Sequence, residues 1–254
     1  MSEEALAVQD GALPQQAGLG FGDYTLKPSR LELLQPTKAV ELGVTPGVFR
    51  DSDSGQTFEK MQVVPLRIQP GRVYWPEGQG LKSKPLCRSR DAVKPVTGPD
   101  LVCQAQTCAK CRHSDWATFR TSGKKPLCQE RWSFLFIDTE SKLPYFMSVG
   151  GVSLKPIRNF RDTITKLYHI AKQKDIKLNI FDFTGEIVPK KIQNAKGYNY
   201  YELQFNNVGR IRNTGDEDFG VFFNQYVLRN QIAAEEDAII EGEVEGTNDA
   251  NESI

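Results

Sequence analysis

The sequence predicts a mainly β protein with two helices and one small metal-folded insertion. All five cysteines of the chain lie between Cys87 and Cys128, together with one of its two histidines. Strand-like segments rich in Val, Ile and aromatic residues lie on both sides of this stretch. Apolar residues recur at helical spacing in residues 156–174 and 218–233. We therefore interpret the rest of the chain as a platform that carries the insertion.

A chain of 254 residues is long enough for one large domain or two small ones. No stretch reaches the roughly 18 to 20 apolar residues that cross a bilayer, so no membrane association is expected. The first residues, Met1-Ser-Glu-Glu, contain neither the basic nor the apolar part of an export signal. We therefore expect a cytoplasmic protein in a reducing compartment, where clustered cysteines bind metal more often than they form disulfides.

The formal net charge of +0 hides an uneven distribution. Residues 235–254 contain eight acids and no Lys or Arg, which leaves 32 basic and 24 acidic residues, a net +8, in the rest of the chain. The eight acids are Glu235, Glu236, Asp237, Glu241, Glu243, Glu245, Asp249 and Glu252. A basic body joined to an acidic tail predicts a polyanionic partner with which the tail competes.

The first part of the chain predicts a leader followed by short strands. Residues 1–22 are rich in Gly, Ala and Gln without a periodic pattern, which is typical of disorder. Residues 26–34 form a first extended element, which Pro36 ends. Residues 47–75 indicate a meander of strands and turns. Its prolines favour edge strands or bulges over one long central strand, and they lie at positions 65, 70 and 76.

Regular structure continues after the insertion. Residues 132–138 are apolar on both alternating faces and join residues 143–148 as a hairpin with a well-buried strand. The amphipathic helix of residues 156–174 follows. Two further strands are expected, one from 178 to 188 that contains a Thr-Gly turn and one from 198 to 208. The second helix then leads into the acidic tail.

This order of elements suits a five-stranded Greek-key barrel of the oligonucleotide-binding (OB) type. A small sandwich would show a similar order. We assign residues 1–22 to the leader, 23–233 to the barrel with a zinc-binding insertion at 86–130, and 234–254 to the acidic tail.

The cysteine spacing predicts a zinc ribbon. Zinc prefers four tetrahedral ligands drawn from thiolate and imidazole, and a Cys-x2-Cys turn supplies two of them. Cys108 and Cys111 form such a turn. Cys128 lies 17 positions after Cys111, which is a normal distance for the second half of a ribbon.

The fourth ligand has three candidates, Cys87, Cys103 and His113. We favour Cys87, because Leu86-Cys87 and Leu127-Cys128 each follow a proline, as if the two cysteines closed the base of the insertion together. His113 is a weaker candidate, because it lies so close to Cys111 in sequence that its imidazole could not easily reach the same zinc ion. Four thiolates leave no open coordination position, so the predicted zinc is structural rather than catalytic.

Aromatic residues beside cations indicate binding of a single-stranded nucleic acid, in which cations follow the phosphates and bases stack on rings. In a strand, Tyr198 and Tyr200 point away from Tyr201, Leu203 and Phe205, and the second set is apolar enough for the core. The predicted contacts are Tyr74, Trp75, Trp116, Lys124, Lys125, Lys190, Lys191, Tyr198 and Tyr200.

These residues also have structural interpretations. The tyrosines of the late strand would cap the core, and Trp116 would fold over its own zinc knuckle. We assign Trp132, Phe134 and Phe136 to the core. The cations of the first helix are typical of a solvated face, whereas the lysine pairs are expected in loops at the ends of the barrel, where side chains reach outward.

Enzyme signatures are missing from the sequence. It contains no phosphate-binding Gly-x4-Gly-Lys-Ser, no His-Glu-x2-His and no dinucleotide Gly-x-Gly-x2-Gly after a strand. The chain has only two histidines, His113 and His169, which are few for the active site of a His-based hydrolase. We therefore expect a protein that binds and does not catalyse.

Several of these motifs together resemble the single-stranded DNA-binding proteins of bacteriophages and related mobile elements, whose OB barrel carries a zinc-ribbon insertion. They are Cys87-Arg-Ser, Cys108-x2-Cys111 followed by Trp116, Pro126-Leu-Cys128, the strand, Ser153 and helix after it, and the acidic C-terminus. The resemblance covers roughly residues 26–254.

The resemblance implies non-catalytic, sequence-tolerant coating of single-stranded DNA during replication, recombination or repair, in a bacterial or phage-infected cytoplasm. It also implies that the tail occupies the empty DNA groove and recruits replication or recombination proteins. The best-known bacterial tails end in Pro-Phe, whereas this chain ends in Glu-Ser-Ile254, so docking to the usual host partners does not follow.

A second hypothesis is a zinc-ribbon factor that docks on transcription or recombination proteins and has no intrinsic DNA affinity. Strong capture of such a protein without binding of oligo-dT would favour it. A third is a nuclease or annealing factor, for which metal-dependent cutting of single strands would be the sign. All three leave open the oligomeric state and the preference between DNA and RNA.

Overall fold

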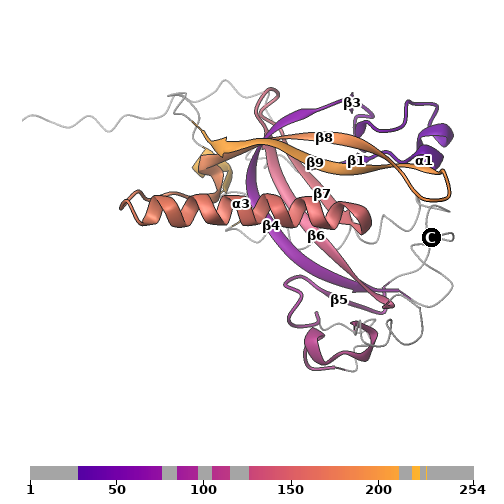
Figure 1. The fold of residues 1–254 in the computed structure, drawn as a ribbon, viewed down its shortest axis with the longest axis horizontal. Coiled ribbons are helices and arrows are strands. Elements are labelled where there is room, and N and C mark those ends of the chain that lie inside the picture. The colour runs from indigo at the N-terminus through magenta and orange to yellow at the C-terminus, as the bar shows by residue number, and fades with distance from the viewer. Residues whose placement is uncertain are drawn as a thin grey trace, which may run out of the picture.

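The computed structural model describes residues 28–75, 85–96, 105–114, 126–211, 219–223 and 227. Within these residues the chain is mainly β, and its strands form one strongly curled sheet, a half-barrel (Figure 1). The strand order is β3-β2-β1-β7-β6-β4-β8-β9, and β5 pairs with β4 beside this path. The predicted leader and acidic tail lie outside the described residues.

The sheet has nine strands instead of the predicted five. They are β1 Ser29–Leu33, β2 Phe49–Asp51, β3 Thr57–Phe58, β4 Met61–Tyr74, β5 Cys87–Ser89, β6 Cys128–Asp138, β7 Pro144–Gly150, β8 Phe183–Gln193 and β9 Asn199–Arg210. The count differs because β2, β3 and β5 have only two or three residues, too few to show an alternating pattern in the sequence.

Three helices accompany the sheet in the described part of the chain. They are α1 Pro36–Glu41, α3 Leu154–Lys172 and α4 Phe219–Phe223. The prediction for α3 is confirmed, and the last predicted helix is described only over α4. The short α1 was not predicted, because Pro36 was read as the end of a strand, although proline also suits the first turn of a helix. None of these helices is both long and apolar enough to cross a membrane.

The long strand β4 contradicts the prediction of edge strands and confirms the predicted bulge. It has 14 residues and pairs with β6 along most of its length, with a register shift between Pro65 and Arg67. On its other edge it pairs with β8 only over 61–63 and with β5 only over 72–74. Pro65 and Pro70 lie between these two stretches, so the missing N–H groups interrupt neither ladder.

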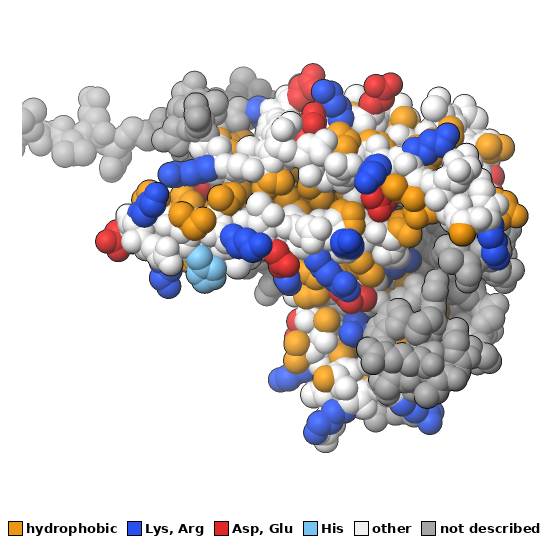
Figure 2. All heavy atoms as spheres, viewed as in Figure 1, with side chains coloured by type: hydrophobic (Ala, Val, Ile, Leu, Met, Phe, Trp, Pro, Cys, Tyr) orange, Lys and Arg blue, Asp and Glu red, His pale blue; other side chains and the backbone are white. Residues whose placement is uncertain are grey.

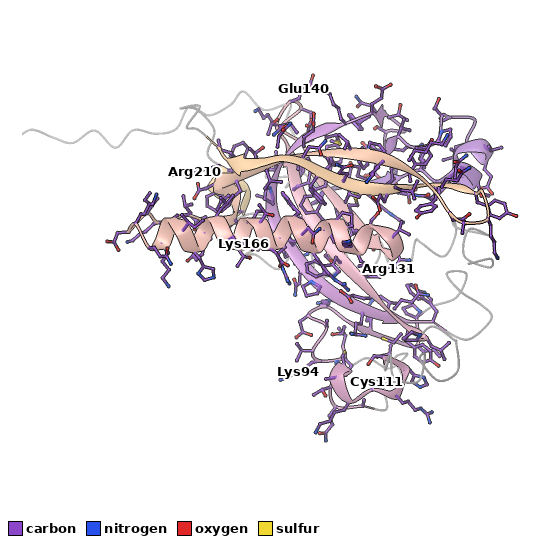
Figure 3. All side chains as sticks on the ribbon, in the orientation of Figure 1. Lys94, Cys111, Arg131, Glu140, Lys166 and Arg210 are labelled. Atoms are coloured by element: carbon purple, nitrogen blue, oxygen red, sulfur yellow. The ribbon has the colours of Figure 1, made fainter. Side chains whose placement is uncertain are left out.

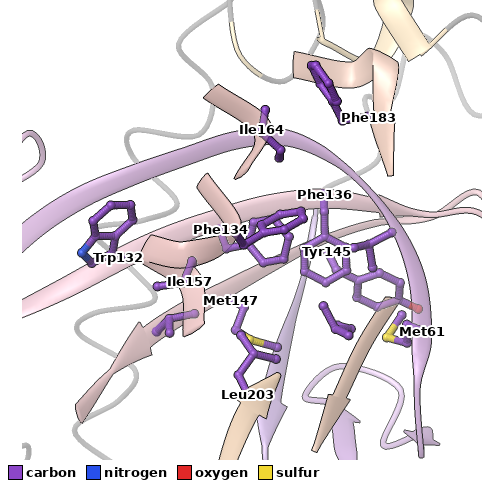
Figure 4. Close-up of a cluster of buried hydrophobic side chains, with 14 of the residues drawn as sticks. Met61, Trp132, Phe134, Phe136, Tyr145, Met147, Ile157, Ile164, Phe183 and Leu203 are labelled. Atoms are coloured by element: carbon purple, nitrogen blue, oxygen red, sulfur yellow. The ribbon is translucent and has the colours of Figure 1, made fainter. Parts of the chain in front are cut away.

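Two apolar clusters bury both faces of the sheet. The first lies between the sheet and α3, and Figure 4 shows Phe134, Phe136 and Trp132 of β6 within it. The second lies on the opposite face, where Leu135 and Ile137 pack with residues that include Phe219 of α4. The prediction that β6 is buried on both faces is therefore confirmed.

Helix α3 lies across the concave face of the sheet (Figure 1). The rings of Phe160 on α3 and Phe205 on β9 stack with centroids 4.1 Å apart. Gly185 of β8 permits this packing, because a Cβ atom there would lie 2.9 Å from the Phe160 ring. The Thr184-Gly185 pair is not the predicted turn but a bulge within β8. Ahead of it, a short 3-10 turn, η5, spans Ile180–Asp182 where strand was predicted.

Two side chains satisfy backbone groups on the open edge of β9, where a closed barrel would have another strand. The Gln35 amide donates to the Tyr201 carbonyl at 2.9 Å and accepts from the Tyr201 N–H at 3.0 Å. The Leu203 N–H donates to the hydroxyl of Ser153 at 2.8 Å. The half-barrel is thus completed by side chains from outside the sheet.

A Ser153→Ala variant is expected to lower the free energy of unfolding by about 1–3 kcal/mol, because it leaves the buried N–H of Leu203 without an acceptor. Urea unfolding measures this change. Thr163→Ala is the control, since the Thr163 hydroxyl bonds the Asn159 carbonyl on an exposed helix surface and should change stability by no more than about 0.5 kcal/mol. Equal stability of the Ser153 variant and the parent chain would show that the Ser153 hydroxyl does not stabilise the edge of β9.

Candidate metal centre and nucleic-acid interface

The candidate site is built on an arm that projects from the sheet below α3 (Figure 1). We define the arm as the described residues 68–75, 85–96, 105–114 and 126–133. Its core is the ribbon formed by the end of β4, the start of β6, and β5. Figure 3 shows Cys111 in the far part of the arm and Arg131 at the end nearer the sheet.

Two of the predicted zinc ligands flank one tyrosine in this ribbon. Tyr74 pairs in register with Cys87 on β5 and with Cys128 on β6. Residues paired across neighbouring strands project from the same face of a sheet. Cys87, Tyr74 and Cys128 therefore share one face of the arm, and the choice of Cys87 with Cys128 as the base of the insertion agrees with this register.

The Cys-x2-Cys pair lies in a knuckle formed by two short 3-10 turns, η2 Cys108–Lys110 and η3 Arg112–Ser114. The Cys111 N–H donates to the Cys108 carbonyl at 3.3 Å. The Ser114 hydroxyl lies 2.5 Å from the Cys108 carbonyl oxygen and 2.9 Å from that of Cys111. Buried Ser114, which sequence reasoning missed, therefore fixes the turn that presents both cysteines.

All four predicted ligands line one cavity of about 260 Å³. Cys87, Cys108 and Cys128 are buried and Cys111 is half-buried. The structure thus brings the four cysteines together, although no three His, Cys, Asp or Glu side chains among the described residues are close enough to count as a metal-binding group. The donor set is all thiol, and thiolates select zinc rather than magnesium or calcium.

Burial sets the chemistry of these thiols. It raises the pKa of the Cys128 thiol to about 11, although the nearby charge of Arg72 acts in the opposite direction. A thiol buried in this way keeps its proton at neutral pH unless a cation replaces that proton, as a zinc ion does. The residues present therefore fit a zinc ion, which Cys87, Cys108, Cys111 and Cys128 would hold.

His113, a weaker candidate for the fourth ligand, also lines the cavity but has other contacts. Its ring stacks on Tyr74 with centroids 4.5 Å apart and planes at 17°. Its Nε2 accepts a hydrogen bond from Arg112 at 3.3 Å. Burial and the Arg112 charge lower the pKa of His113. Cys103, the remaining candidate, lies outside the described residues.

One face of the arm continues the face covered by α3, and we call it the notch face. Figure 2 shows the surface hollowed between α3 and the arm. The Trp132 indole donates to Glu130 at 2.6 Å, and the guanidinium of Arg161 on α3 lies 4.7 Å from the Trp132 ring centroid. The residues of the notch face are Arg72, Tyr74, Glu130, Trp132, Arg158 and Arg161.

Glu130 ties the arm to α3 through an ion pair with Arg158. Burial opposes ionisation of this carboxyl, but hydrogen bonds from Arg158 and Trp132, together with nearby positive charge, outweigh it and hold the pKa of Glu130 below its usual value. The carboxylate therefore stays charged at neutral pH and keeps the two cationic elements side by side.

The opposite face of the arm is rich in arginine, and we call it the arginine face. It comprises Arg88, Arg90, Arg131 and Trp75, and Arg67 lies on the same side of β4 just outside the arm. The Arg131 guanidinium lies 5.6 Å from the ring centroid of Trp75, which is 5% exposed. Burial, with a smaller contribution from the charge of Arg90, lowers the pKa of Arg67 to about 10. Tyr74 and Trp75 thus lie on opposite faces and do not form one stacking platform.

Positive charge in the described residues is concentrated on the arm and α3. The arm has seven Lys and Arg against two acids, and α3 has five against one. The other described residues have twelve cations against eleven acids. The arm and α3 therefore carry a net +9 of the +10 in the described chain. Their surfaces are where a polyanion would be attracted.

The other predicted contacts lie elsewhere or outside the described residues. Lys190 and Lys191 are not in a loop, as predicted, but in β8, where they point to opposite faces, and Lys190 lies 3.5 Å from Glu202. Tyr198 is 63% exposed in the β8–β9 hairpin and Tyr200 is half-buried. The predicted binding residues that lie outside the described residues are Trp116, Lys124, Lys125 and the tail acids.

The sequence reading missed the arginines that surround the aromatic rings of the arm. The sequence predicts a solvated helix face for Arg158 and Arg161, whereas their spacing of three puts both on one side of α3, toward the arm. Arg72 belongs to the stretch Arg72-Val-Tyr74-Trp75, in which a cation stands beside aromatic residues, whereas no local pattern indicates Arg131, because its face depends on strand register. In comparisons with known proteins, no family model, no curated protein and no solved structure matches this chain.

Proposed function

We propose that this protein binds single-stranded DNA without sequence preference and coats it during replication, recombination or repair. The observation that carries the proposal is the net +9 on the arm and α3, whose notch face combines Arg72, Arg158 and Arg161 with the half-buried ring of Tyr74. Single-stranded nucleic acid is bound by this combination of cations and aromatic platforms.

The proposed architecture is an OB-type barrel with a zinc-ribbon insertion, in line with the resemblance to phage and mobile-element proteins. The curled half-barrel is compatible with it, and β5 and the cysteine knuckle lie in the sequence between the paired strands β4 and β6, as an insertion would. Structural zinc bound by the four cysteines would hold the knuckle against the ribbon. No catalytic step is assigned to any residue.

On the notch face each group has a role in this binding. Arg72, Arg158 and Arg161 would neutralise phosphates, which gives affinity for any sequence. Tyr74 is half-buried, and the ring face away from His113 offers a base a surface worth about 1–3 kcal/mol of stacking. Stacking tolerates every base because each has a π face.

The acidic tail has a regulatory role in this proposal. Its eight carboxylates would lower the affinity of the basic body for DNA and recruit replication or recombination proteins. A chain without residues 235–254 should therefore bind oligo-dT more tightly than the full chain. Unchanged affinity would speak against this role of the tail.

Changing Arg72, Arg158 and Arg161 together to Gln tests the interface. We expect weaker binding of oligo-dT, and a plot of log affinity against log salt that is shallower by about 2, because each single-strand phosphate contact contributes about 0.7 to the slope. Fluorescence titration at several salt concentrations measures both quantities. The parent chain should also prefer oligo-dT to a duplex of equal length.

A triple change of Arg50, Lys60 and Lys142 to Gln is the matched control. It removes the same charge from strands and turns of the sheet outside the arm and α3. This control should keep the parent slope. Equal slopes for the two triple variants would exclude the notch face, and equal affinity for oligo-dT and duplex would exclude the function.

A further inference from the structure

One arginine of the notch face also reaches the cysteine cavity. Arg72 lines this cavity together with all four predicted zinc ligands. It pairs in register with Glu130, which follows Cys128 by two residues on β6 and therefore shares a face with it. The Arg72 guanidinium donates a hydrogen bond to the Cys128 side chain. Arg72 thus contacts the candidate metal centre from the notch face.

The charges around Cys128 show what this contact does. Burial raises the pKa of the Cys128 thiol most, and the charges of Cys111 and Cys108 raise it further. The charge and the hydrogen bond of Arg72 act in the opposite direction and favour the thiolate. Arg72 therefore opposes the mutual repulsion that ionised sulfurs have in this cavity.

A zinc ion does not remove the need for such a partner. A divalent ion compensates only two of the four thiolate charges that bind it, so a site of four thiolates keeps an excess of negative charge. In a site as buried as this one, an uncompensated charge is costly. A cation that also donates a hydrogen bond to one of the sulfurs lowers this cost.

The two other arginines that line the cavity have different contacts. Arg112 donates to the ring of His113 in the knuckle. Arg88 pairs in register with Val73, one position along from Tyr74, and so projects from the arginine face. Arg72, in contrast, directs its guanidinium to a cysteine sulfur.

We propose that Arg72 is a positioning residue of the zinc site, in which its guanidinium donates to the zinc-bound thiolate of Cys128 and offsets the excess negative charge. Groups that hydrogen-bond to metal ligands fix their orientation and tune the affinity for the metal. A guanidinium has five N–H donors, so Arg72 keeps donors for Glu130 or a phosphate while it serves the sulfur. The assignment rests on the zinc site of the proposed function and is independent of DNA binding.

Competition of the full chain with a chromophoric zinc chelator tests this role. Arg72→Gln should lower the zinc affinity about 10- to 100-fold, the usual effect of removing a partner of a metal ligand. Arg72→Lys keeps the charge but loses the planar fork of donors, so its affinity should lie between those of Arg72→Gln and the parent chain. Lys94→Gln is the matched control, because it removes an exposed cation of the arm that does not line the cavity, and it should keep the parent affinity.

The absorption spectrum of the cobalt(II)-loaded chain separates this role from a general loosening of the arm. A hydrogen bond lowers the energy of sulfur lone pairs, so the thiolate-to-cobalt charge-transfer band should move to longer wavelength in Arg72→Gln. The visible bands of tetrahedral cobalt should keep their intensity. Lys94→Gln should show the parent spectrum, whereas a collapsed arm would lose the bands instead of shifting one of them.

Several results would overturn the assignment. They are parent-like zinc affinity in Arg72→Gln, an equal loss in Lys94→Gln, an unshifted charge-transfer band, and a parent chain that binds no zinc. If Arg72→Gln fails to fold, Arg72→Lys decides between severalfold weaker zinc binding with a shifted band, as expected, and parent-like behaviour. A chain that shows the Arg72 effect but has no affinity for oligo-dT would keep this assignment and refute the proposed function.

Discussion

If Cys87, Cys108, Cys111 and Cys128 hold zinc as proposed, a Cys128→Ser variant is expected to lose the ion and the ordered geometry of the arm. The serine hydroxyl is a poor zinc ligand compared with a thiolate, and the remaining donors cannot complete a tetrahedron. Apparent binding energies of structural zinc are about 10–16 kcal/mol in small zinc-finger peptides, so loss of the ion would remove much of the stability of the knuckle. The half-barrel should remain folded, because its two clusters lie outside the cysteine cavity.

Zinc content per chain, measured with a colorimetric chelator after denaturation, checks this result. The parent chain should hold one equivalent and Cys128→Ser none. Cys103→Ser is the control, since Cys103 is the cysteine not assigned to the site, and it should retain one equivalent. If Cys103→Ser lacked zinc and a Cys87→Ser variant retained it, the fourth ligand would be Cys103 and not Cys87.

Loss of the zinc should also weaken DNA binding. Tyr74 pairs in register with Cys87 and Cys128 in the ribbon, and its ring stacks on His113 in the knuckle, so all three neighbours belong to the proposed zinc site. Oligo-dT affinity should fall in Cys128→Ser by the stacking energy of about 1–3 kcal/mol, or roughly 5- to 150-fold. Full affinity for oligo-dT in a zinc-free protein would show that DNA binding does not depend on the metal.

A Phe134→Ala variant should lose about 3–5 kcal/mol of stability, which is the usual cost of truncating a buried phenylalanine. Phe134 is fully buried and its ring contacts Phe136, Phe160 and Phe205, so it joins β6 to α3 and β9. The cavity left behind would lie where three elements meet and could collapse only if α3 moved.

The free energy of unfolding in urea measures this loss, and Tyr198→Ala provides the control. It removes another aromatic ring, but one that is 63% exposed, so stability should change by no more than about 0.5 kcal/mol. A small loss in the Phe134 variant would mean that α3 is not held by this cluster.

Local patterns predicted the parts of the structure that depend on neighbouring residues. Helix α3 was expected at 156–174 and spans Leu154–Lys172, because its apolar spacing is a property of the helix itself. The four cysteines could be selected because few residue types bind zinc and their spacing is restricted. The strand order could not be predicted in this way, since pairing joins segments far apart in the chain.

The faces of the arm show why the binding residues were harder to identify. The bulge between Pro65 and Arg67 adds one residue to β4, so every later residue of the strand projects from the face opposite to that expected from simple alternation. It places Arg72 and Tyr74 beside α3 and Trp75 on the other side. Nothing local in the sequence indicates where a bulge falls within a proline-containing strand, so the side of the sheet on which Tyr74 or Trp75 lies could not be predicted.

The side chains that complete the half-barrel also affect how copies of this protein behave beside one another. An open sheet has two edges, and a long unpaired edge strand can add a strand from another molecule and start aggregation. On β9, Gln35 and Ser153 already occupy the backbone groups of Tyr201 and Leu203. At the other end of the sheet, β3 is only two residues long. Copies of this protein at high concentration would therefore remain separate at these edges instead of joining sheet to sheet.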